Sequence, residues 1–171
     1  MNTAQLNSIL KKDKFTSVLH NGVFASDQLP KNISYPAAFI FNTDPSYMPG
    51  MHWVAVYFDK SGKCSYFDSY GLQPFVNSIE TFLAKSDYQF NKLQIQGNDS
   101  NVCGHYCILF LTRCARGHTM ERIVNEFNFA PAGHFDELVK CLVTATFSNL
   151  PNITYRCNQK CLSFAKWKSN E

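Results

Sequence analysis

Residues 93–117 read LQIQGNDSNVCGHYCILFLTRCARG, and the rest of the 171-residue chain is organised around them. Apolar and polar residues alternate over 93–96, which predicts a short strand, and the polar run GNDSN that follows predicts a turn. From Gly104 onward apolar residues recur at helical spacing, and Gly117 ends the helix. Cys103 therefore lies where a polar loop becomes a buried helix. The unpaired N–H groups and the dipole of a helix N-terminus favour a thiolate, so this position suits a nucleophile.

The composition favours one domain that covers residues 1–171. The chain is 45% hydrophobic and contains 15 Phe, which is enough apolar material for a packed core. It has no apolar run long enough to span a membrane, and its first residues lack the form of a signal peptide. Seven cysteines without a paired spacing pattern favour free thiols over a secreted disulfide scaffold. We therefore expect an intracellular, reducing location and no membrane partner.

The order of the apolar patterns predicts an α+β fold, in which helices pack on a small antiparallel or mixed central sheet. Residues 15–30 are expected to form a loop, because Gly22 and Pro30 interrupt them. Strands are expected over residues 35–42, 52–58, 64–68 and 87–96, and helices over residues 3–10, 75–83, 104–117, 120–127 and 135–143.

The clearest β pattern is a hairpin formed by residues 52–58 and 64–68. His52 opens its first strand and Asp68 closes its second, so both residues lie at the same end. A loop of three or five residues centred on Ser61 pairs Val54 with Asp68 and places His52 diagonally across from that carboxylate. A loop of two or four residues does not. The sequence leaves both registers open.

A cysteine protease needs a thiolate, an imidazole that pairs with it, a group that orients the imidazole and donors for the oxyanion. Cys103, His52, Asp68 and Gln96 supply one residue for each of these roles. The combination alone is weak evidence, because a chain with seven Cys and five His offers many such pairs. The position of Cys103 at the start of a helix strengthens it.

Each of these residues also has a structural interpretation. Asp68 suits a turn that ends a strand, Gln96 suits an edge strand, and Trp53 suits either the core or the wall of a cleft.

Cys157 and Cys161 are spaced like half of a zinc site, but no second pair follows them. The remaining cysteines are expected to pack as small apolar residues; they are Cys64, Cys107, Cys114 and Cys141.

The net charge of +3 is too small to indicate a nucleic-acid-binding protein by itself. The segment 150–171 matches no pattern, but its charged residues up to residue 170 are all basic. It provides either a solvated face or a weak contact for DNA or another polyanion through Arg156, Lys160, Lys166 and Lys168.

Several motifs resemble the adenovirus-type cysteine proteases (adenain), which share a core fold with the SUMO-deconjugating proteases. The resemblance covers about residues 5–145 and includes GMHW at 50–53, YFDSYG at 66–71, QG at 96–97 and VCGHYC at 102–107. The order of the site residues, His, acidic residue, Gln and then Cys, is also that of the family. The resemblance implies a single cysteine-protease domain with its nucleophile at the N-terminus of a buried helix.

The resemblance also implies a role for each residue. Cys103 is the nucleophile, His52 its base and general acid, and Asp68 the carboxylate that orients His52. The side-chain amide of Gln96 and the backbone N–H of Cys103 form the oxyanion hole. Trp53 and Gly104 are expected to lie in the wall of the substrate cleft.

The implied function is a thiol endopeptidase that cleaves viral or virus-like capsid or core precursors at glycine-containing sites through an acyl-enzyme. No cofactor is required, although family members use a peptide activator and DNA. A disulfide-linked activator is not expected, because no cysteine lies between Cys64 and Cys103. A viral enzyme of this kind acts in the host nucleus or cytoplasm and in the virion. The alternatives are a deconjugating protease for a ubiquitin-like modifier and a non-catalytic binding module with the same fold.

Overall fold

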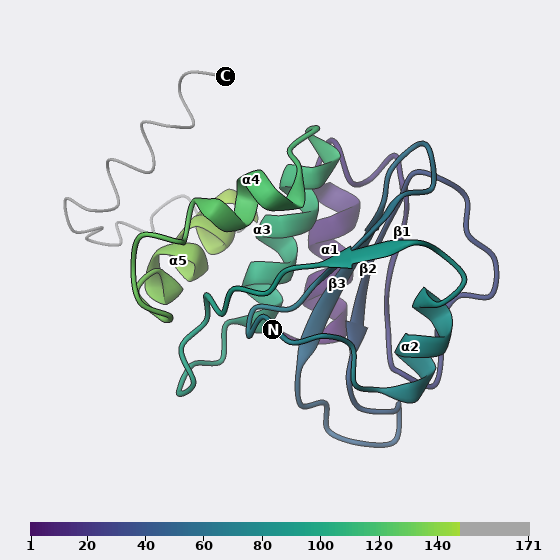
Figure 1. Cartoon of the computed structure of the whole chain (residues 1–171), viewed down its shortest axis with the longest axis horizontal. Coiled ribbons are helices and arrows are strands. Elements are labelled where there is room, and N and C mark those ends of the chain that lie inside the picture. Colours follow the sequence, from purple (N-terminus) through teal and green to yellow (C-terminus); the bar gives the residue numbers. More distant parts are fainter. Residues whose placement is uncertain (148–171) are drawn as a thin grey trace.

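A computed structural model describes residues 1–147, and this part of the chain has the predicted α+β class, with a five-stranded sheet and five helices (Figure 1). The strands are β1 (His20–Phe24), β2 (Ala37–Asn42), β3 (Trp53–Phe58), β4 (Cys64–Phe67) and β5 (Tyr88–Phe90). The helices are α1 (Thr3–Lys12), α2 (Asn77–Leu83), α3 (Cys103–Ala115), α4 (Met120–Asn125) and α5 (Asp136–Phe147). The strands lie side by side in chain order. The outer pairs are parallel and the inner pairs antiparallel, so the sheet is mixed.

Both faces of the sheet are covered, which explains why the central strand β3 is apolar along its whole length. One face, which includes Ala38 and Ala55, packs against α1, α3, α4 and α5. The other face, which includes Phe39 and Phe41, packs against α2. Figure 1 shows α2 on the opposite side of the sheet from α3, α4 and α5. The sheet therefore separates two apolar cores.

The hairpin adopts the register that aligns the two candidate site residues. Phe58 pairs with Cys64, so the connecting loop has five residues and is centred on Ser61. The same register continues from the pair Ala55–Phe67 to Val54 and Asp68. His52 therefore lies diagonally across from Asp68 at the open end of the hairpin.

Helix α3 is the predicted buried helix, and it begins at Cys103 and ends at Ala115. Ten of its residues are buried, because it packs against the sheet on one side and against α5 on another. Gly117 follows it with a φ of +91°, a left-handed conformation that suits glycine after a helix. The nucleophile candidate is thus fixed to the most buried helix among residues 1–147.

The prediction of a loop over residues 15–30 was wrong in part, because His20–Phe24 form β1. This short strand contains Asn and Gly, which are typical of turns, and it lies at an edge of the sheet. Its pairing with β2 supplies the backbone hydrogen bonds that its own composition does not predict.

The predicted strand over residues 87–96 was also wrong in part, since β5 covers only Tyr88–Phe90. The backbone N–H groups of Ile95 and Gln96 both donate to the carbonyl oxygen of Ser69, at 2.9 and 3.0 Å. Residues 93–96 therefore bond to the turn after β4 instead of extending the sheet. Likewise, α2 begins after Phe75, whose side chain is exposed.

The predicted polyanion contact of the 150–171 segment, through Arg156, Lys160, Lys166 and Lys168, lies outside the described residues, as does the Cys157–Cys161 pair. Among residues 1–147, no helix is both long enough and apolar enough to cross a membrane.

Candidate active site

Cys103 is the first residue of α3, and its side chain is buried. A residue at this position has a backbone N–H without a partner inside the helix. The next residue, Gly104, lies in a narrow space. A Cβ atom on Gly104 would lie 3.3 Å from Leu6 and 3.4 Å from Trp53. Gly104 therefore allows α1 and Trp53 to approach the start of the helix closely.

His52 and Asp68 form a buried hydrogen-bonded pair. His52 Nε2 lies 2.8 Å from Asp68 Oδ1. Burial by itself lowers the pKa of His52, but the hydrogen bonds and charges of Asp68 and Cys103 outweigh burial and raise this pKa from 6.5 to about 9. The imidazole is therefore positively charged at neutral pH.

The pKa of Cys103 moves in the opposite direction from that of His52. Burial raises it, but a hydrogen bond with His52, backbone hydrogen bonds with Trp53 and Gly104 and the charge of His52 bring it below the ordinary value of 9.0. Each of the two shifts therefore favours the charged form of its own group, the imidazolium of His52 and the thiolate of Cys103.

The other buried cysteines show that this effect is local. Burial raises the pKa of Cys64 to about 12, and it also raises the pKa of Cys107 and Cys114. All three are free thiols inside the protein, as expected for cysteines that pack as small apolar residues. Among the four buried cysteines of residues 1–147, Cys103 alone has a lowered pKa.

Asp68 is held in place by a residue that sequence reasoning missed. Asn91 is buried; its Oδ1 accepts from the backbone N–H of Asp68 at 2.9 Å, and its Nδ2 donates to the backbone oxygen of Asp68 at 2.6 Å. Asp68 Oδ1 also accepts from the backbone N–H of Tyr70 at 2.8 Å. The second carboxylate oxygen, Oδ2, is buried without a hydrogen-bond partner among the described residues. Asn91 lies 23 residues from Asp68, so no local pattern indicates its role.

Gln96 is buried, and hydrogen bonds to three residues fix the orientation of its side-chain amide. Ser69 Oγ donates to Gln96 Oε1 at 2.6 Å. Gln96 Nε2 donates to the backbone oxygen of Ser100 at 2.8 Å and to the hydroxyl oxygen of Tyr70 at 3.2 Å. Both hydrogen bonds of Nε2 and the one to Oε1 therefore hold the Gln96 amide in a single orientation.

Asp136 anchors the loop that follows Gln96, and the sequence did not indicate this role either. It accepts from the backbone N–H of Gly97 at 3.0 Å and from the hydroxyl of Tyr106 at 2.9 Å. Tyr106 belongs to α3 and Asp136 is the first residue of α5. Asp136 therefore fixes the Gln96 segment relative to the helix that carries Cys103.

Trp53 lies next to the site, as the sequence led us to expect. Its Nε1 donates to the backbone oxygen of Met1 at 3.1 Å, and its backbone oxygen accepts from Cys107 Sγ at 3.3 Å. Trp53 is half-buried. Its place beside Gly104 is compatible with the wall of a substrate cleft, and that role stays a prediction.

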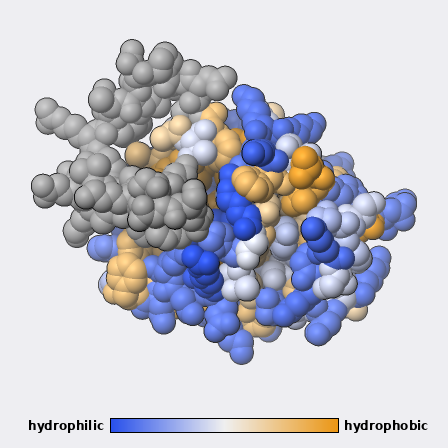
Figure 2. Space-filling view, turned by 90° about the horizontal axis from the view of Figure 1, so that it is seen from above, coloured by the Kyte–Doolittle hydropathy of each residue, from blue (hydrophilic) through white to orange (hydrophobic). Residues whose placement is uncertain are grey.

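Apolar side chains are exposed in the loop that leads to His52. Tyr47 is 83% exposed and Met51 is 80% exposed. Figure 2 shows a face that is largely hydrophilic, with separate apolar areas. Exposed apolar side chains beside a reactive group are available for contact with the side chains of a bound chain.

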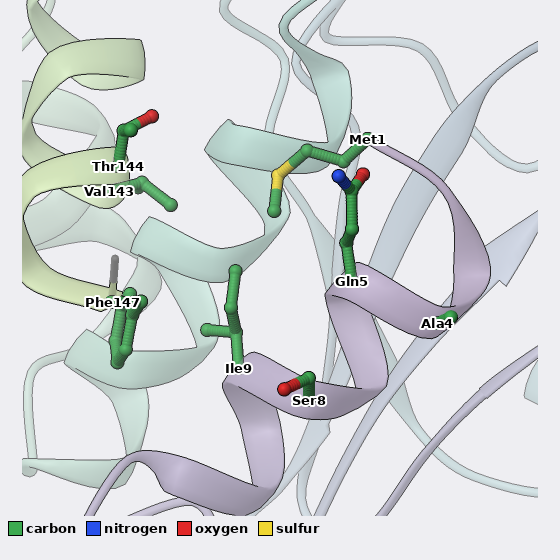
Figure 3. Close-up of a pocket in the computed structure, with 8 residues that line it drawn as sticks. All are labelled: Met1, Ala4, Gln5, Ser8, Ile9, Val143, Thr144 and Phe147. Atoms are coloured by element: carbon green, nitrogen blue, oxygen red, sulfur yellow. The ribbon is translucent and has the colours of Figure 1, made fainter. Parts of the chain in front are cut away.

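A separate pocket of about 440 Å³ lies between α1 and α5, and it is lined by Ile9, Val143 and Phe147 among others (Figure 3). None of the predicted site residues lines it. Among residues 1–147, no three His, Cys, Asp or Glu side chains form a group that could hold a metal ion. The groups around Cys103 are a thiol with a lowered pKa, an imidazole and oriented hydrogen-bond donors, and this set suits acyl transfer.

Comparison with known proteins agrees with this chemistry. A protein of Acanthamoeba polyphaga mimivirus named "Putative thiol protease" is 37% identical over 109 residues. The match covers 57% of this chain and 35% of the mimivirus protein, so it spans about a third of that protein's length. No family model matches the chain.

Two crystal structures of an ASFV protease are also similar. Their TM-scores are 0.42 and 0.41, and both are 19% identical to this chain. The similarity covers 52% of this chain and 37% and 36% of theirs.

Proposed function

We propose that the chain is a thiol endopeptidase of the adenain type, with Cys103 as nucleophile. The observation that carries this proposal is the buried chain of contacts from Asp68 through His52 to Cys103, in which the pKa of the imidazole is raised and that of the thiol is lowered. Such opposite shifts in adjacent groups are typical of a working acid–base pair. The partial sequence match to a viral protein named as a thiol protease supports the same chemistry.

The residues divide the reaction between them as follows. The Cys103 thiolate attacks the carbonyl carbon of the scissile peptide bond, and the electron pair of the C=O bond moves to oxygen. The backbone N–H of Cys103 and the amide of Gln96 donate hydrogen bonds to this oxyanion. The C–N bond then breaks, and the leaving amine takes the proton of His52. This step leaves an acyl group on sulfur.

Water completes the cycle. It loses a proton to His52 as its oxygen attacks the thioester carbonyl, and the C–S bond breaks to release the carboxylic acid and the thiolate. Asp68 keeps the imidazole in the orientation that both proton transfers require, because it accepts from Nε2 and leaves the other ring nitrogen for the sulfur.

The proposed substrates are viral or virus-like precursor proteins cut at glycine-containing sites, as the resemblance in sequence implies. Glycine presents little side-chain bulk, which suits a cleft lined by Trp53. The five cysteines of residues 1–147 are free thiols, which fits the reducing, intracellular location that we propose.

The test compares the wild-type chain with Cys103→Ala on glycine-rich peptides and on a co-expressed capsid precursor. We expect cleavage by the wild type and none by the variant. Cys141→Ala, which alters a half-buried cysteine of α5, is the matched control and should cleave like the wild type. Equal cleavage by wild type and Cys103→Ala would reject the proposal. Reaction of Cys103 with a ubiquitin-like protein that carries a C-terminal electrophile, without peptide cleavage, would favour a deconjugating protease instead.

A further inference from the structure

Tyr70 contacts both halves of the candidate site, although neither its position in the sequence nor the proposed chemistry assigns it a role. It is half-buried in the turn that follows Asp68. Its ring packs on the imidazole of His52, with ring centroids 4.9 Å apart and an angle of 32° between the planes. Its hydroxyl oxygen accepts from Gln96 Nε2 at 3.2 Å.

We propose that Tyr70 is a positioning residue of the active site, whose ring keeps His52 aligned between Asp68 and Cys103 and whose hydroxyl holds the Gln96 amide in place. This inference rests on the proposed function. It assigns Tyr70 no bond to the substrate: Tyr70 acts through the base and the oxyanion donor.

The ring contact restricts the imidazole. A histidine side chain rotates about two bonds, and the bond from Asp68 fixes only one ring nitrogen. A flat ring whose centroid lies 4.9 Å away, inclined by 32°, restricts the imidazole from tilting out of the line between carboxylate and sulfur. An aromatic face also attracts a cationic ring, which favours the charged imidazole that the thiolate needs. Without this contact, the imidazole has conformations in which its bond with Cys103 is lost.

The backbone around Tyr70 is fixed firmly enough for the side chain to act in this way. Its N–H donates to Asp68 Oδ1 at 2.8 Å, the atom that also accepts from His52. Gly71 follows with a φ of +70°, and a Cβ atom there would lie 2.7 Å from the backbone carbon of Leu93. The turn thus lies directly against the 93–96 segment. The side chain of Tyr70 joins His52 on one side to Gln96 on the other.

The pKa of Tyr70 also reflects the proximity of its hydroxyl to the thiol of Cys103. Burial is the main cause that raises the pKa of Tyr70, and the charges of Cys103 and Asp68 add to it. The phenol is therefore protonated at neutral pH and adds no charge to the site.

The test measures the pH dependence of Cys103 alkylation by iodoacetamide, with mass spectrometry of the Cys103 peptide as readout. It compares the wild type with Tyr70→Leu, which removes the ring, and with Tyr70→Phe, which removes only the hydroxyl. Tyr57→Leu is the control, because Tyr57 is a half-buried tyrosine on β3 that packs against the core. A structural loss alone would not move this pH profile, which reports the His52–Cys103 pair.

We expect the onset of alkylation in Tyr70→Leu to move to higher pH by about half a unit to one unit. Tyr70→Phe and Tyr57→Leu should keep the wild-type onset. In Tyr70→Phe the cleavage of a glycine-rich peptide should nevertheless fall about three- to tenfold, because one hydrogen bond that orients Gln96 is lost. If Tyr70→Leu does not fold, Tyr70→Met provides a second side chain that has no ring and is similar in volume to Leu.

An unchanged onset in a folded ringless variant would overturn the inference while leaving the proposed function intact. Wild-type cleavage by Tyr70→Phe would overturn the part assigned to the hydroxyl. If Cys103 of the wild type reacts no faster than the other thiols, the proposed function fails, and this inference fails with it.

Discussion

Replacing Asp68 with Asn tests the acid–base pair most directly. Asn has nearly the same shape and an oxygen that accepts a hydrogen bond from His52, but it has no charge. The pKa of His52 is raised from 6.5 to about 9, and Asp68 is the larger of the two causes that raise it. This difference corresponds to about 3 kcal/mol of interaction in favour of the charged imidazole. Asp68→Asn should remove most of it.

Loss of the Asp68 charge first affects the pKa of the Cys103 thiol. The charge of His52 helps to lower the pKa of Cys103, so a less basic imidazole leaves the thiol protonated to higher pH. At about pH 6, we expect alkylation of Cys103 by iodoacetamide to fall about ten- to a hundredfold. Peptide cleavage should fall further, on the order of a thousandfold or more, because a neutral amide no longer selects the productive tautomer of the imidazole.

The assay follows Cys103 alkylation from about pH 5 to about pH 9.5, so that the whole titration is seen. The direction of the change follows from the raised pKa of His52 and the lowered pKa of Cys103. The alkylation rate of the wild type should rise with pH below the ordinary pKa of a thiol, and the rate of Asp68→Asn should rise only at a higher pH. Asp87→Asn, which alters an exposed carboxylate before β5, is the matched control and should follow the wild type. A folded Asp68→Asn protein with the wild-type profile would refute the reasoning.

Three further substitutions test the surroundings of the pair. Gln96→Leu should lower peptide cleavage about a hundredfold or more and leave the Cys103 alkylation rate near that of the wild type, since an oxyanion donor acts only in the transition state; a parallel loss in both assays would contradict this role. Asn91→Ala removes two hydrogen bonds to the backbone of Asp68 and should lower the free energy of unfolding by about 2–3 kcal/mol in urea denaturation, and a loss well below 1 kcal/mol would show that Asn91 does not hold the turn. Gly71→Ala should destabilise the protein by more than about 1 kcal/mol and reduce cleavage, because the new methyl group meets the backbone of Leu93. The control is Gly117→Ala, which also has a positive φ but has nothing within 4 Å of its Cβ position, so it should cost only the backbone strain. Equal melting temperatures of the two variants would argue against the close contact at Gly71.

Local sequence patterns predicted the elements that are long and strongly periodic. The helix that begins at Cys103 and the hairpin on either side of Ser61 were both expected, because each depends on residues within a few positions of one another. Shorter elements were less predictable. The edge strand β1 and the irregular course of residues 93–96 both depend on hydrogen bonds to distant segments.

The sequence by itself determined the α+β class, a cysteine at the start of a buried helix and a histidine and an aspartate at one end of a hairpin. Only the tertiary structure decided that the hairpin has a five-residue loop and that His52 Nε2 lies 2.8 Å from Asp68 Oδ1. It alone also placed Asn91, Asp136 and Tyr70 around the site. The physical reason is that secondary structure follows from the periodicity of neighbouring side chains, whereas these contacts join residues brought together only when the sheet and α3 pack. The acidity of a thiol depends on burial and on charges across such contacts, and no local pattern encodes it.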